Sequence, residues 1–200
     1  PKHSVDRGEL LQFTSGGHVV GFIPNKVYLA SLSHALSIEF LGTSGVMPKV
    51  EGGVSGGRRK APPLGRVTYH DLWPGISVRY ESEGRKIAKS TYFVEPGADV
   101  GRIQLAYNVP VEVQKDGSLR FSYKNGYMTE SLPLAWQEVE GKRISVPVSF
   151  KVSEGKRVRF GVKGYDARYP LVIDPSYQWH TFYGSSSADG GNSIAVDGNG

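Results

Sequence analysis

The chain has 200 residues, of which 26 are glycine, 12 are proline and none is cysteine, and its formal net charge is +5. That length supports one large domain or two small ones with a buried core. The lack of cysteine excludes disulfides, thiolate metal ligands and cysteine nucleophiles.

Basic residues outnumber acidic ones only slightly, by 12 to 9 in residues 1–100 and by 12 to 10 in residues 101–200. Nucleic-acid-binding proteins usually concentrate their basic residues on one face or in one tract, so we expect no nucleic-acid partner. No apolar run approaches the ~18–20 residues that cross a bilayer as a helix, so we expect no membrane-spanning segment.

Short apolar runs between turn-forming residues indicate an all-β fold. His18–Ile23 and Val27–Leu32 are predicted to form a hairpin, and Ala35–Leu41 alternates like a half-buried strand. Residues 42–65 then contain seven glycines and three prolines, which is typical of a long surface loop. Its basic tip, Arg58–Lys60, is either a solvated connector or a protease-sensitive or anion-binding segment.

From Arg66 the sequence favours a series of antiparallel hairpins in a β-sandwich-like domain. Residues 66–69 and 76–81 alternate on either side of a turn at Trp73–Gly75. Turn dipeptides follow at Asp116–Gly117 and Asn125–Gly126, where further hairpins are expected.

The longest alternating stretch runs from Ile144 to Val162. We expect it to form one stable hairpin with a single buried apolar face, made by Val146, Val148, Phe150, Val158 and Phe160. Pro147 cannot donate to a β-ladder, which predicts an edge strand or a bulge at this point.

Two stretches near the end of the chain, Thr181–Ser185 (TFYGS) and Ile194–Asn199 (IAVDGN), carry a family resemblance. They resemble the first unit of the bacterial β-propeller repeat known as the SBBP repeat. The segment before them resembles the β-rich domain that commonly precedes such propellers. Its hairpin motif falls on Val67, Tyr69, Asp71, Trp73, Pro74, Gly75, Ile76 and Tyr80. Two further motifs fall on Tyr92–Tyr107, where the step Pro96–Asp99 is expected to form a turn and one helical turn, and on Pro133–Arg143.

The resemblance implies a β-rich domain over residues 1–174 and a truncated first propeller repeat over residues 175–200. Asp174 before Pro175 suits a chain that leaves one sheet and enters another, because the residue before proline is held extended.

Residues 175–200 are too few to complete a four-stranded propeller blade. We therefore expect Trp179–Tyr183 or Ile194–Val196 to pair with an exposed strand edge, of this domain or of a neighbouring copy.

The residues do not indicate a reaction centre, and we assign no catalytic, cofactor-binding or metal-binding residue. The five histidines, at positions 3, 18, 34, 70 and 180, lack metal-binding spacings such as HxH or HExxH. Glycosidase chemistry needs two carboxylates about 5–10 Å apart, and the candidates by count alone are Glu130, Glu138, Asp166 and Asp174. Turn capping and surface solvation account for each of these carboxylates. Candidates for stacking on a sugar are Trp73, Trp136 and Trp179, although most aromatic residues alternate with aliphatic ones as core residues do.

We predict a non-catalytic structural or interaction module of a secreted or cell-surface bacterial β-propeller protein, located outside the cell or in the cell envelope. The expected partners are the rest of the propeller and an extracellular glycan or protein. The alternatives are a carbohydrate-binding module or a carbohydrate-active hydrolase. An exposed aromatic strip would favour sugar binding, and a cleft with two carboxylates of perturbed pKa would favour an enzyme. Neither feature would favour a structural module.

Overall fold

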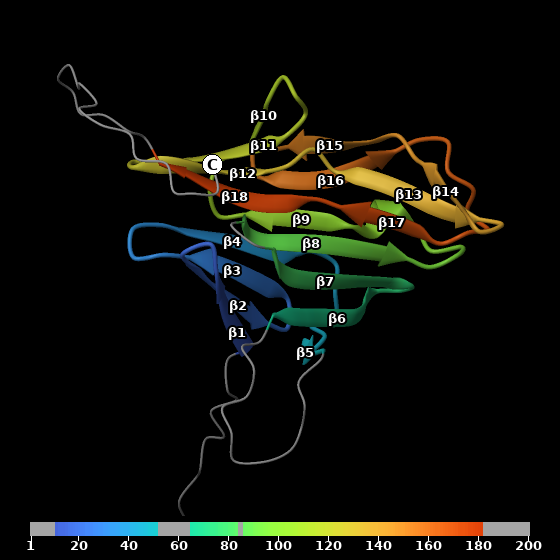
Figure 1. The fold of residues 1–200 in the computed structure, drawn as a ribbon, viewed down its shortest axis with the longest axis horizontal. Coiled ribbons are helices and arrows are strands. Elements are labelled where there is room, and N and C mark those ends of the chain that lie inside the picture. The colour runs from blue at the N-terminus through green and yellow to red at the C-terminus, as the bar shows by residue number, and fades with distance from the viewer. Residues whose placement is uncertain (1–10, 52–64, 84–85, 182–200) are drawn as a thin grey trace, which may run out of the picture.

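The computed structural model describes residues 11–51, 65–83 and 86–181. Over these residues the chain forms two antiparallel sheets, of seven and eleven strands, and contains no α-helix. Strands make up 62% of the described residues, far above the roughly 25% that is usual for globular domains. The two sheets share one hydrophobic core, and Figure 1 shows how their strands are arranged. The prediction of an all-β, β-sandwich-like antiparallel domain is confirmed.

The smaller sheet contains β1 (Leu11–Ser15), β2 (His18–Ile23), β3 (Lys26–Ala30), β4 (Ala35–Phe40), β9 (Gln104–Tyr107), β15 (Val148–Ser153) and β16 (Arg157–Val162). Their order across the sheet is β1-β2-β3-β4-β9-β16-β15. The first four strands are consecutive hairpins, and β9 joins them to a later hairpin made by β15 and β16. On β4, Leu36, Ile38 and Phe40 are all buried, as their alternation predicts.

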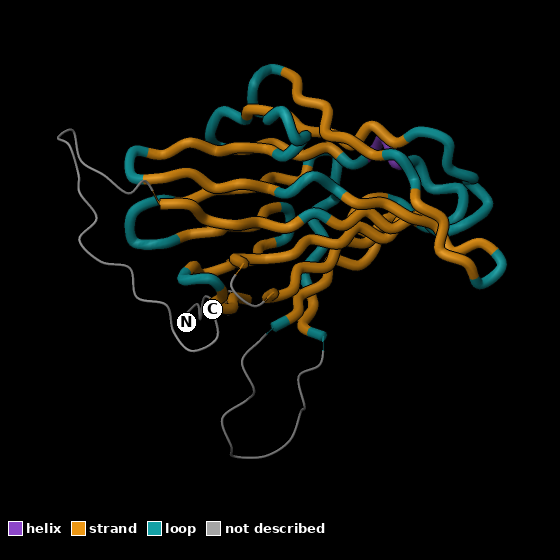
Figure 2. The backbone as a smooth tube through the Cα atoms, turned by 45° about the horizontal axis from the view of Figure 1, so that its top comes forward, coloured by secondary structure: helices purple, strands orange, loops and turns teal. Residues whose placement is uncertain are grey.

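The larger sheet contains β5 (Lys49–Val50), β6 (Arg66–Trp73), β7 (Ile76–Glu83), β8 (Lys86–Val94), β10 (Glu112–Val113), β11 (Leu119–Tyr123), β12 (Gly126–Glu130), β13 (Leu134–Val139), β14 (Lys142–Ser145), β17 (Leu171–Asp174) and β18 (Ser176–Thr181). Eight of them follow the order β10-β11-β12-β18-β8-β17-β13-β14, and β7, β6 and β5 extend from the free side of β8. The turn predicted at Pro96–Asp99 leads into a 3-10 turn, η1 (Val100–Arg102), in which Asp99 caps the amide of Gly101. Figure 2 shows the described chain as strands joined by loops, with the short turn η1 in purple.

Aromatic pairs join the two sheets across the core. Phe22 of β2 meets Tyr80 of β7 edge to face with the ring centroids 5.6 Å apart. Tyr92 of β8 meets Phe160 of β16 in the same way at 5.0 Å. Edge-to-face contacts of this kind are favourable beyond the area that they bury, so they help to fix how the sheets lie on each other.

β17 and β18 form one line through the larger sheet, interrupted at Pro175 (Figure 1). β17 lies between β8 and β13, whereas β18 lies between β8 and β12. Asp174 therefore marks a change of neighbour within one sheet, and the prediction that the chain enters another sheet here is wrong. The larger sheet continues through the expected boundary after Asp174 as far as Thr181.

The pairing expected for Trp179–Tyr183 is confirmed as far as Thr181. β18 pairs with β12 of the same chain, with Trp179 opposite Met128 and Thr181 opposite Gly126. Tyr183 and the second expected segment, Ile194–Val196, lie outside the described residues, as does most of the expected propeller repeat.

The chain crosses from the larger to the smaller sheet around Pro147. β14 ends at Ser145 in the larger sheet, and β15 begins at Val148 as the edge strand of the smaller sheet. A single hairpin starting at Ile144 is therefore wrong, since that residue is 49% exposed on β14. The edge strand that Pro147 predicts is confirmed.

The surface loop expected over residues 42–65 is described only at its two ends. Lys49 and Val50 form β5 and pair with Thr68 and Val67 of β6. The basic tip, Arg58–Lys60, lies outside the described residues, so both interpretations of it stay predictions.

The hairpin of β15 and β16 buries most of the apolar face that the alternation predicts. Val146, Phe150, Val158 and Phe160 are buried, whereas Val148 is only half-buried. We expect Phe150→Ala to lower the free energy of unfolding by about 3–5 kcal/mol, because the Phe150 ring packs 5.5 Å from that of Phe160. Ile144→Ala is the control and should cost less than about 1 kcal/mol. Urea denaturation measures both, and equal losses would mean that Phe150 does not support the core.

Candidate functional site

The four carboxylates considered from the sequence are not gathered around one cleft. Glu138 is exposed on β13, and Asp166 forms an ion pair with a neighbouring arginine in the loop before β17. Asp174 lies 2.9 Å from Nζ of Lys89 on β8. Glu130 is completely buried. Surface solvation, expected for these carboxylates, fits the exposed Glu138, but it is wrong for Glu130, which is buried between the sheets.

Glu130 lies among tyrosines between the sheets. Its Oε2 accepts a hydrogen bond from the hydroxyl of Tyr107 at 2.8 Å, and that hydroxyl lies 3.2 Å from the hydroxyl of Tyr177. Tyr80 and Tyr92 are buried close by, and Oε1 of Glu130 has no hydrogen-bond partner among the described residues. Burial raises the pKa of Glu130 to about 7, although the hydrogen bonds from Tyr107 and Tyr177 act in the opposite direction. The carboxyl is closed off from solvent, so it belongs to the core rather than to a reaction centre.

Two histidines meet at one end of the sandwich. Nε2 of His18 on β2 lies 2.7 Å from Nε2 of His34, in the turn between β3 and β4. Trp179 of β18 stacks on His34, with ring centroids 3.6 Å apart and an angle of 11° between the planes. This contact ties the hairpins of the smaller sheet to the strand that runs through the larger one.

The partners of the two histidines define their neutral tautomers. Nδ1 of His18 lies 2.8 Å from the carbonyl oxygen of Gly16, which only accepts, so Nδ1 carries the hydrogen. Nε2–H of His34 then donates to His18, and Nδ1 of His34 accepts from the hydroxyl of Ser31 or Ser33. Burial, followed by the proximity of His18, lowers the pKa of His34. The described residues contain no group of three or more His, Asp or Glu side chains that could hold a metal ion, and we assign no metal to this pair.

The three tryptophans considered for sugar stacking lie in different environments. Trp73 is 1% exposed and donates from Nε1 to the carbonyl oxygen of Leu41. Trp179 is covered by His34. Trp136 is half-buried on the outer face of the larger sheet, where the guanidinium carbon of Arg143 lies 3.5 Å from its ring centroid.

A groove of about 420 Å³ lies on the outer face of the larger sheet, over β11, β12 and β18. Tyr127 of β12 stands at its centre, flanked by Arg120 of β11 and His180 of β18. The guanidinium carbon of Arg120 lies 4.0 Å from the Tyr127 ring centroid, and the His180 ring stacks on Tyr127 at 4.6 Å with an angle of 12°. The remaining lining includes the polar side chains of Gln114, Asp116, Ser118, Thr129 and Gln178.

The groove combines one positive and one negative charge with neutral polar groups. Nε2 of His180 lies 3.0 Å from Oγ1 of Thr129. Burial, and then the nearby Arg120, lower the pKa of His180, so this ring is neutral at pH 7. Hydrogen bonds from the hydroxyl and amide of Ser118 lower the pKa of Asp116. The arrangement can bind a ligand through charge and hydrogen bonds.

Sequence reasoning missed the groove because it assigned most aromatic residues to the core. The signal for Tyr127 was present, since Gly126, Met128 and Glu130 alternate with it and face inward. Its neighbour His180 could not be found in this way, because the register between β12 and β18 joins residues far apart in the sequence.

A model of the family described as a domain of unknown function (DUF7948) matches residues 51–176, which is more than half of the chain. The chain belongs to this family. The match extends over β6 to β17 and includes most of the groove. No curated protein and no solved structure matches the DUF7948 chain. In the part of the chain that the structure describes, no helix is long and apolar enough to cross a membrane.

Glu130 should make stability depend on pH near neutrality. The unfolded carboxyl ionises near its usual pKa of 4.5, whereas the folded one keeps its proton up to a pH of about 7. The free energy of unfolding should therefore fall by about 3 kcal/mol as the pH rises through this window. Glu130→Gln should remove the fall, and Glu138→Gln, at an exposed position, should leave it in place. Urea denaturation at several pH values measures the slope, and an unchanged slope in Glu130→Gln would contradict this assignment.

His34 should have the opposite effect. Because its folded pKa lies below the usual 6.5, the unfolded chain takes up a proton first, and stability should fall as the pH drops below about 6.5. His34→Gln should reduce this loss, whereas His70→Gln, at an exposed position on β6, should not. The same denaturation series tests both variants, and equal slopes in the two would count against a lowered pKa of the buried His34.

Proposed function

We propose that this DUF7948 domain is a non-catalytic binding module, and that the groove around Tyr127 takes a carbohydrate. The observation that carries the proposal is the set of side chains that converge there. Arg120 supplies guanidinium donors, Asp116 supplies acceptors, and the amides and hydroxyls beside them do both. Such convergent polar groups in a depression are what a hydroxyl-rich ligand requires.

The groove supports binding better than it supports hydrolysis. Glycoside hydrolases place two carboxyl groups about 5–10 Å apart on either side of the scissile bond. Asp116 is the carboxylate that lines this groove, and Glu130, whose pKa is raised, is buried beneath the sheet. A purely structural module is the alternative, because cation–π and aromatic contacts between neighbouring strands also stabilise a sheet. The polar side chains that line the groove beside this stack favour binding.

The setting of the module belongs to the same proposal. The resemblance of Thr181–Ser185 and Ile194–Asn199 to SBBP repeats supports a secreted or cell-surface bacterial protein with a β-propeller as its neighbour. An extracellular glycan would be accessible to the outer face of the larger sheet in that setting.

A glycan array that contains neutral and acidic oligosaccharides tests the proposal. We expect retention of at least one class of glycan and a loss of about tenfold in affinity for Tyr127→Ala, which removes the centre of the stack. Tyr28→Ala is the matched control, because Tyr28 is 37% exposed on the smaller sheet. Melting temperatures verify that both variants fold. An array without any retained glycan, or equal binding by the two variants, would refute the proposal.

A further inference from the structure

The groove is the first of three depressions that share walls along the outer face of the larger sheet. A second, of about 170 Å³, lies over Pro175 and shares Ser131 and Leu132 with the groove. A third, of about 300 Å³, lies over Trp136 and shares Leu134 with the second. Ser131 and Leu132 lie in the connection between β12 and β13, and Leu134 is the first residue of β13. The three depressions thus lie in a row along this face, and we call the row the trough.

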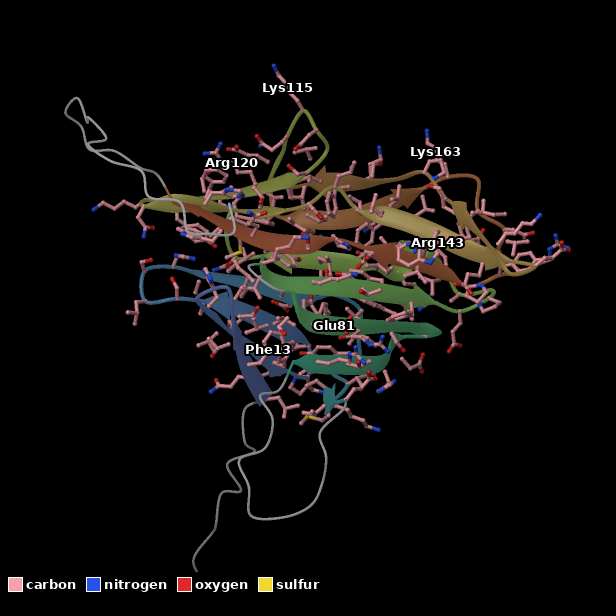
Figure 3. The ribbon with its side chains drawn as sticks, viewed as in Figure 1. Phe13, Glu81, Lys115, Arg120, Arg143 and Lys163 are labelled. Carbon is pink, nitrogen blue, oxygen red and sulfur yellow. The ribbon has the colours of Figure 1, made fainter. Side chains whose placement is uncertain are left out.

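The trough follows the line of β18 and β17 through the sheet. His180 lies at one end, and Val172, which pairs with Trp136, lies at the other. The eight residue steps from Val172 to His180 span about 26 Å at a strand rise of about 3.3 Å per residue. Figure 3 shows Arg120 and Arg143 near opposite ends of this sheet. A ligand that fills the trough is therefore a chain rather than a single sugar.

Both ends of the trough present a guanidinium group over an aromatic ring. Arg120 covers Tyr127 at 4.0 Å, and Arg143 covers Trp136 at 3.5 Å. At the first end the ring is covered from both sides, because Arg120 and His180 come from the two strands that flank β12. The groups that face a ligand there are guanidinium donors and polar side chains rather than an open ring face.

Cationic side chains outnumber carboxylates along the trough. Lys86, Lys89, Arg120 and Arg143 line it, against Asp116 and Asp174. Asp174 is already paired with Lys89 at 2.9 Å. Guanidinium groups bind carboxylates through two parallel hydrogen bonds, so the two arginines suit acidic groups spaced along a polymer.

We propose that the trough binds an extended acidic polysaccharide, with uronate carboxylates at Arg120 and Arg143. This inference rests on the proposed function, because the Arg120 end is the proposed carbohydrate groove. A single-stranded nucleic acid has similar length and charge, but such strands bind by stacking bases on open aromatic faces. The covered ring of Tyr127 does not offer such a face.

Calorimetric titration of the whole chain with oligogalacturonates, from the dimer to the decamer, tests the inference. We expect the affinity to rise with length, and Arg143→Gln should lower the affinity for the decamer by about tenfold and abolish most of that rise. Arg120→Gln should weaken the decamer to a similar extent. Arg159→Gln is the matched control on the smaller sheet, where Arg159 bonds Gln104, and it should bind like the unmodified chain.

The outcomes separate the two proposals. Equal affinities for the dimer and the decamer would overturn the extended trough and leave the groove intact. Equal binding of the methyl-esterified decamer would overturn the acidic class of ligand, and tighter binding of an oligothymidylate would overturn the carbohydrate assignment. If no oligogalacturonate binds while a neutral glycan still binds through Tyr127, the acidic polysaccharide is wrong and the carbohydrate groove stands. If no glycan of any class binds, the proposed function is refuted as well.

Discussion

The place of β18 between β12 and β8 is the constraint on which the rest of this structure depends. Without it, the strands β10 to β12 would lose their connection to the remainder of the larger sheet. Alternation along β18 sends Tyr177 inward to the Glu130 cluster and Trp179 inward to His34, while His180 points outward into the groove. The core, the contact between the sheets and the candidate binding surface therefore share one strand.

Glu130 and its tyrosine partners hold the two sheets together, but burying the carboxyl has an electrostatic cost. A buried carboxyl is unfavourable unless its oxygens are hydrogen-bonded, and Glu130 satisfies only one of its two oxygens with protein groups that the structure describes. These hydrogen bonds join the two sheets, because Tyr107 comes from the smaller sheet, whereas Glu130 and Tyr177 come from the larger one. Hydrogen bonds between them fix how one sheet lies on the other, which apolar packing alone specifies less sharply.

The alternation of apolar and polar residues was sufficient to predict most strands, because a strand with one buried face carries apolar residues at every second position. The alternation did not reveal where the chain leaves one neighbouring strand and pairs with another. Ile144 and Phe150 belong to one alternating pattern, yet they lie in different sheets, and Pro147 was the only local sign of the crossing. Asp174 and Pro175 gave a similar sign, but there the chain stays in its sheet. The groove was within reach of such reasoning only in part. Residues 114–132 of its lining are local in sequence, whereas Gln178 and His180 join them through the pairing of β12 with β18.

The family match covers most of the candidate binding surface but only part of the core. Residues 51–176 include Lys89, Arg120, Tyr127, Trp136 and Arg143, which line the trough from one end to the other, and end as β18 begins. The strands β1 to β4 lie before the match, and they pack beneath the larger sheet through pairs such as Phe22 and Tyr80. The matched region thus supplies nearly all of the candidate binding surface. The hairpins before it and the strand after it close the core that holds this surface in shape.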